Sequence, residues 1–125
     1  MSKYSQYLIT ALNIFPVKSL AGNPVTEAFA EERGFRHDRK WMIVDENHKF
    51  ITQRKSPEMG FLGVHILPDG IAIFDKKNIT DIIEISHQQS KATVQVTIWN
   101  DVCKAEKILS PEVSEWLSGK IGTNC

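Results

Sequence analysis

Short apolar runs alternate with polar residues along most of the chain, and turn-forming residues separate them. The alternation is clearest in residues 61–67 and 93–99, where nearly every second position is apolar. Successive side chains of a strand point to opposite faces, so this period of two indicates half-buried strands. Pro68-Asp69-Gly70 is a strong turn sequence, and residues 45–48 supply the turn of a predicted hairpin. We expect strands at residues 7–17, 25–31, 41–44, 50–52, 61–67, 71–74, 81–85, 93–99 and 102–108.

One helix is predicted after the last of these strands. Ser110 fits the N-cap, Pro111 the first helical position, and Gly119 the stop. Three apolar residues between them share one face and are expected to pack on the strands: Val113, Trp116 and Leu117. Short strands joined by turns favour a barrel or sandwich over a parallel α/β fold. The fold class we predict is mainly β, a small barrel of short, mostly antiparallel strands with one C-terminal helix.

The length and composition fit one domain over residues 1–125, and the balance of charges excludes a strong overall electrostatic field. Lys plus Arg number 15, as do Asp plus Glu, which gives a net charge of zero. We therefore expect neither nucleic acid nor an anionic membrane as a partner. The start of the chain does not resemble a signal peptide, and no apolar run approaches the ~20 residues of a membrane span. A cytoplasmic location is the expectation.

The two cysteines, Cys103 and Cys125, have the spacing of neither a disulfide framework nor a zinc site. Cys103 lies in an alternating segment, so we expect a buried structural thiol. The four histidines are scattered and have no partner at metal-ligand spacing: His37, His48, His65 and His87. No Ser/His/Asp set, phosphate-binding loop or dinucleotide motif is present. We expect neither catalytic residues nor a metal site in this chain.

Basic residues stand next to the expected strands at three places. Lys18-Ser19 follows the first strand, Arg39 precedes the strand at 41–44, and Arg54 follows the strand at 50–52. If those strands are neighbours, an ammonium, a hydroxyl and two guanidinium groups converge into an anion cradle. The alternative is that these cations are simply solvated.

Asp38 and Arg39 are adjacent in the sequence, and strand geometry would send their side chains to opposite faces. We therefore expect that they need not pair. Asp38 is expected to hydrogen-bond backbone in the turn. Arg39 either points into a cleft or ties two loops together.

Three ordered blocks carry a resemblance to a known family: residues 12–19, residues 34–45, and residues 50–54 with Pro57. Together they resemble the N-terminal β-barrel domain of MOSC proteins, relatives of the C-terminal region of molybdenum-cofactor sulfurase. The group includes the mitochondrial amidoxime-reducing component and bacterial reductases of N-hydroxylated compounds. The likeness runs from about Tyr7 to the end of the chain. We therefore expect the front part of a longer protein.

The resemblance implies that this barrel packs against a C-terminal MOSC domain, with the pterin cofactor of molybdenum in the cleft between them. Lys18, Ser19 and Arg39 match the residues that approach the pterin and its phosphate. Arg54 is a weaker candidate, which alternatively braces the hairpin. The family's metal ligand is a cysteine of the MOSC domain, which this chain does not contain, and Cys103 does not match it. Some relatives also carry a ferredoxin-like domain, a possible electron donor.

The leading hypothesis is a cofactor-binding module of a molybdenum-dependent oxidoreductase that reduces N-hydroxylated compounds. The module alone is expected to be inactive. One alternative is a stand-alone small barrel that binds nucleic acid or protein. Another is a pyridoxal-phosphate protein, in which Lys18 forms a Schiff base.

Overall fold

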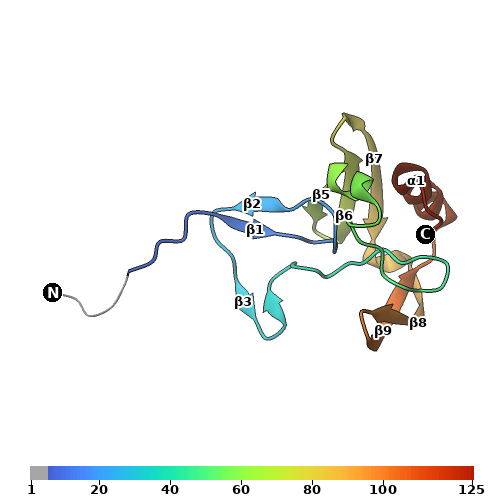
Figure 1. The fold of residues 1–125 in the computed structure, drawn as a ribbon, viewed down its shortest axis with the longest axis horizontal. Helices are drawn as coiled ribbons and strands as arrows, with labels where there is room; N and C mark the ends of the chain where they lie inside the picture. Colours follow the sequence, from blue (N-terminus) through green and yellow to red (C-terminus); the bar gives the residue numbers. More distant parts are fainter. Residues whose placement is uncertain (1–5) are drawn as a thin grey trace.

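The computed structural model describes residues 6–125, without the side chains of residues 89–91. These residues form short strands, two 3-10 helices and one α-helix (Figure 1). The strands are β1 (Leu12–Ile14), β2 (Asn23–Val25), β3 (Ala30–Glu31), β4 (Gly34–Phe35), β5 (Leu62–Leu67), β6 (Gly70–Asp75), β7 (Asn78–Ser86), β8 (Ser90–Ile98) and β9 (Asp101–Ile108). The helices are η1 (Pro57–Phe61), η2 (His87–Gln89) and α1 (Pro111–Ile121).

All pairs of named strands are antiparallel. β5, β6 and β7 form a three-stranded sheet, and β1–β2, β3–β4 and β8–β9 form separate two-stranded units. In Figure 1 the β1–β2 and β3–β4 hairpins extend away from the body that contains the three-stranded sheet and α1. The predicted class, mainly antiparallel β with one C-terminal helix, is confirmed. Within residues 6–125 the strands do not close into one continuous barrel.

The N-terminal part is less regular than its sequence pattern predicts. The strand expected at 7–17 is regular only in β1, and the one expected at 25–31 bends after Val25 before resuming in β3. Pro24 lies within β2 and has no N–H to donate, which favours a short ladder. Single bridges replace regular strands at residues 41–44 and 50–52. Val17↔Trp41 joins the first segment to residues 41–44, and Val44↔Phe50 joins residues 41–44 to residues 50–52. The strand predictions here identified segments that do lie side by side, but these segments do not form regular strands over the predicted lengths.

The bridges join the irregular segments side by side. Trp41 N donates to Pro16 O at 3.0 Å, and Ile51 N donates to Ile43 O at 3.2 Å. Phe50 N then donates to Thr97 O of β8 at 3.1 Å. Four segments therefore lie side by side in the order 15–18, 39–44, 49–51 and β8. The condition set for the anion cradle, that the first strand, the Trp41 segment and its hairpin partner are neighbours, is therefore met.

The helix begins where the sequence predicts and ends three residues beyond the predicted stop. Ser110 Oγ accepts a hydrogen bond from Val113 N at 3.4 Å, and Pro111 opens α1. The stop is Gly122, whose φ of 80° is the left-handed conformation that glycine adopts readily. Gly119 lies inside the helix, so its prediction as the stop was wrong. With 11 residues, α1 is too short to span a bilayer, and it is the sole α-helix in residues 6–125.

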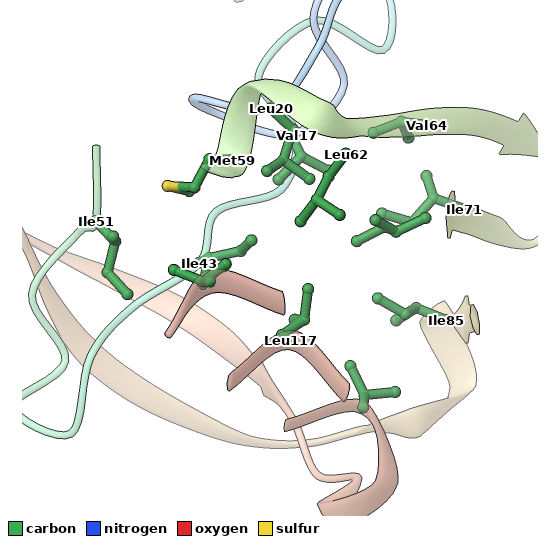
Figure 2. Packing of buried hydrophobic residues seen from close by; sticks show 13 residues of the cluster. Val17, Leu20, Ile43, Ile51, Met59, Leu62, Val64, Ile71, Ile85 and Leu117 are labelled. Atoms are coloured by element: carbon green, nitrogen blue, oxygen red, sulfur yellow. The ribbon is translucent and has the colours of Figure 1, made fainter. Parts of the chain in front are cut away.

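The core lies between α1, the sheet and the bridged segments. Figure 2 shows Leu117 pointing into the same apolar interior as Ile43, Leu62 and Ile85. Val113 and Leu117 are buried as predicted, and Trp116 is half-buried against the same cluster. Val17 also belongs to the core, so packing anchors the residue directly before Lys18. The full buried cluster is Val17, Leu20, Ile43, Ile51, Met59, Leu62, Val64, Ile71, Ile73, Ile85, Val113, Leu117 and Ile121.

A charged network fastens α1 to the sheet. Lys120 Nζ donates to Asp75 Oδ2 at 2.9 Å and also bonds to Asp81 Oδ2. Trp116 Nε1 donates to Asp81 Oδ1 at 2.8 Å. The hydrogen bond from Lys120 lowers the pKa of both carboxyl groups below 3.8, and the two carboxylates raise the pKa of Lys120 above 10.5. Each ion of the network therefore favours the charged state of its partner.

This network predicts how stability depends on pH. The contribution of the lowered Asp75 and Asp81 pKa values is complete above pH 3.8 and is lost as the pH falls through the folded values. The contribution of the raised Lys120 pKa is complete below pH 10.5 and is lost as the pH rises further. We expect urea unfolding to show lower stability at both extremes. Lys120→Met should reduce both losses, and an unchanged pH profile in this variant would contradict the assignment.

Candidate anion-binding site

Backbone hydrogen bonds fix Lys18 and Ser19 at the end of a bridged segment. Lys18 N donates to Trp41 O at 3.0 Å, and Leu20 N turns back to Val17 O at 3.2 Å. Ser19 has a φ of 69°, in the left-handed region that residues other than glycine rarely adopt. Leu20 is fully buried immediately after it. The core thus holds the turn from both sides, and strain of this kind persists only where the surroundings impose it.

The Lys18 ammonium lies against two aromatic rings. Its Nζ is 4.5 Å from the centroid of Phe50 and 5.5 Å from that of Trp99, and these two rings are 4.9 Å apart. No Asp or Glu among the described side chains lies within ion-pair distance of Lys18. Cation–π contacts hold an ammonium in place without neutralising its charge. Lys18 is therefore a positioned cation whose charge remains available to an anion.

Arg39 differs from Lys18, because its charge is already partly offset. Its Nη1 donates to Asp38 Oδ2 at 2.6 Å, although the guanidinium side chain is 57% exposed. The expectation that these neighbours need not pair was wrong for a specific reason. Arg39 has a φ of 46° in a turn, so the alternation of strand side chains does not apply. The other Asp38 oxygen accepts a hydrogen bond from Phe15 N at 2.8 Å, so Asp38 does bond to backbone, but to the first segment and not within its own turn as expected.

Arg39 is also tied to the first segment. Its N donates to Phe15 O at 2.6 Å, and its Cζ lies 4.7 Å from the centroid of the Phe15 ring. A Cβ at Gly22 would lie 2.7 Å from that ring, so the absence of a side chain there makes room for Phe15. Phe15 and Lys18 are separated by at most about 10 Å of extended chain. The structure therefore brings Lys18 and Arg39 onto adjacent segments, with Arg39 tying two loops together.

Arg54 lies in the neighbouring turn. Its side chain is exposed and makes no ion pair with the described side chains. The residue before it reaches the site directly, because Gln53 Nε2 donates to Ser19 O at 2.7 Å. The turn that carries Arg54 is thus fastened to Ser19 by Gln53. Neither binding of an anion by Arg54 nor bracing of the hairpin is visible in its own contacts.

Sequence reasoning did not select Phe50, Gln53 or Trp99. The available signal for Trp99 was its place beside the turn residues Asn100-Asp101, where a large aromatic residue is unusual. The structure leaves Trp99 61% exposed. Three other aromatic residues are also about half exposed: Phe29, Phe35 and Phe61.

Cys103 is exposed, so the prediction of a buried thiol was wrong. The reason is that β9 belongs to a two-stranded unit and is largely exposed on both faces, which a period-two pattern does not reveal. Both cysteines are free thiols.

The histidines do not assemble a metal site within the described residues. His37 and His87 instead line a shallow cavity of about 80 Å³, together with Lys40 and Trp41. The Trp41 and His87 rings stack there with centroids 4.8 Å apart.

The fold and the site define a mainly antiparallel β domain with a cationic turn held by aromatic and backbone contacts. The family described as the MOSC N-terminal beta barrel domain matches residues 6–124, and the chain belongs to this family. A molybdenum cofactor sulfurase of Danio rerio is 32% identical over 97% of this chain, and that of Homo sapiens is 27% identical over 95%. Mitochondrial amidoxime reducing component 2 of Homo sapiens is 30% identical over 66% of the chain.

The chain spans only part of these relatives. It aligns with 15% and 14% of the two sulfurases and with 25% of the amidoxime reducing component. The resemblance read from the sequence is confirmed at the level of the family. The sulfurases are named for the molybdenum cofactor, which gives this domain an indirect link to that cofactor.

Proposed function

We propose that this domain forms one wall of the cleft that holds the pterin cofactor of molybdenum in a larger protein. Lys18 binds the phosphate of the cofactor, Ser19 donates a hydrogen bond, and Arg39 and Arg54 add positive charge nearby. The observation that carries this proposal is the position of Lys18 Nζ over Phe50 and Trp99 without a carboxylate partner among the described residues. A cation held in this way fits an anionic phosphate group.

The other wall of the cleft is, in this proposal, a C-terminal MOSC domain. Large apolar side chains on the protruding part of the domain support a partner surface. Phe29 and Phe35 of the β3–β4 region are 56% and 48% exposed, and Tyr7, Leu8 and Ile9 are more exposed still. Exposed apolar side chains gathered in a patch are typical of interaction sites, and the Phe29 and Phe35 segments pair with each other here. A ferredoxin-like electron donor and a cytoplasmic location belong to the same proposal.

The reaction of the whole protein is proposed from its relatives. The amidoxime reducing component favours an oxidoreductase that reduces N-hydroxylated compounds, with the chemistry outside this domain. The sulfurases provide a second candidate, a protein that acts on the molybdenum cofactor itself. A phosphate-binding turn serves both, because either protein has to hold the cofactor. Pyridoxal-phosphate binding and the binding of nucleic acid stay predictions.

The proposal predicts weak binding of the cofactor by this chain alone. Each charge-assisted hydrogen bond contributes roughly 1.5–3 kcal/mol, and exposure to water reduces that contribution. We expect calorimetry with the isolated cofactor to give a Kd of about 1 mM, near −4 kcal/mol. Micromolar or tighter binding would contradict a half-site. A complete lack of interaction at ten times that concentration would contradict phosphate recognition.

A further inference from the structure

Trp99 occupies the tight turn between β8 and β9 in a conformation that is unfavourable for it. Ile98 pairs with Asp101, so Trp99 and Asn100 form a two-residue turn. Trp99 has a φ of 54°, where glycine or asparagine is the usual choice in such turns. A bulky residue with positive φ is a genuine outlier, and outliers of this kind gather at functional sites. Turn formation alone does not explain a tryptophan at this position.

Burial does not explain Trp99 either, because the residue is 61% exposed. Its ring instead lies against Phe50, at 4.9 Å and a 55° tilt, and against Lys18 Nζ, at 5.5 Å. The backbone enforces this meeting of three segments. Thr97 N donates to His48 O at 3.0 Å and Phe50 N donates to Thr97 O at 3.1 Å, which places the end of β8 beside Phe50.

We infer that Trp99 is a positioning residue for Lys18, and that with Phe50 it forms an aromatic shelf that holds the ammonium ready for an anion. A free lysine side chain samples many rotamers and loses that freedom on binding. The shelf removes part of this cost in advance, because preorganised groups bind with less ordering. This inference rests on the proposed function and adds residues that set the affinity of its anion site.

The test uses NMR of the lysine side chains and titration with glycerol phosphate as the probe. In Trp99→Gly the ring is gone and the backbone strain is relieved, so folding is expected to survive, which the amide spectrum checks. The Lys18 Hε resonances should move toward those of an exposed lysine. Phosphate affinity should fall about 3- to 10-fold, and Trp99→Phe should recover most of it.

Phe61→Leu is the matched control, since Phe61 lies under another lysine, with Lys77 Nζ 4.2 Å from its centroid. It should shift Lys77 and leave Lys18 and the phosphate affinity unchanged. Unchanged Lys18 resonances and affinity in Trp99→Gly would overturn the inference while the proposed function stands. A wild-type chain that binds no phosphate would overturn the proposed function, whatever the Lys18 resonances show.

Discussion

Gly70→Ala is expected to destabilise the domain by about 3 kcal/mol or more, the upper part of the range for overpacking. A Cβ at this buried position would lie 1.9 Å from Ile85 O and 2.9 Å from Ile85 C. Both are backbone atoms of β7, which pairs with β6 at this point through Gly70↔Ser86. A side chain could rotate away from such a clash, but the paired backbone cannot. The new methyl group therefore has to break the ladder or push the strands apart.

Gly119→Ala is the matched control, because nothing lies within 4 Å of a Cβ at that position. Gly119 is inside α1, where alanine is favoured over glycine by about 1 kcal/mol. Urea unfolding should thus show the same substitution lowering stability at residue 70 and raising it at residue 119. Equal stability of Gly70→Ala and the wild-type chain would mean that the β6–β7 contact differs from the one described.

Lys18→Met is expected to weaken phosphate binding about tenfold, which equals 1.4 kcal/mol. Methionine keeps an unbranched apolar stem and removes the ammonium group with its charge. Arg39→Met should cost less, because Asp38 already offsets the Arg39 charge at 2.6 Å. A chemical-shift titration with glycerol phosphate measures these differences at millimolar affinity.

Lys77→Met is the control for Lys18→Met. Lys77 also lies over an aromatic ring, 4.2 Å from the Phe61 centroid, but at the β6–β7 turn. Its removal should leave the affinity unchanged. An equal loss in both variants would indicate general charge attraction, and a larger loss at Arg39 than at Lys18 would reverse the roles that we assign.

The sequence predicted best what depends on nearby residues. The turn at Pro68-Asp69 separates β5 from β6 as expected, and Ser110 caps α1. Both follow from side chains that act within a few positions of themselves. The end of α1 was misplaced, because Gly119 and Gly122 are equally plausible stops until packing of Ile121 in the core carries the helix further.

The candidate site shows more clearly which features could not be predicted from the sequence. The pattern of residues placed Lys18, Arg39 and Arg54 near strand ends, and the family resemblance gave them a ligand. Neither source contained the contact of Lys18 with Phe50 and Trp99, which joins residues 32 and 81 positions apart in the sequence. The pairing of Asp38 with Arg39 was also missed, because it depends on a left-handed turn rather than on a strand. Contacts between residues far apart in the sequence, and turns with positive φ, therefore decide whether the charge of each cation is offset by a neighbour or left for a ligand.

The central claim is that Lys18 is the cation of this domain prepared for a phosphate group. Observing every lysine side chain by NMR during a glycerol phosphate titration tests it most directly. We predict that the Lys18 Cε and Hε resonances shift with saturation near millimolar phosphate, while those of Lys40 and Lys77 barely move. Similar, non-saturating shifts at all three lysines, or no shift at Lys18, would contradict it.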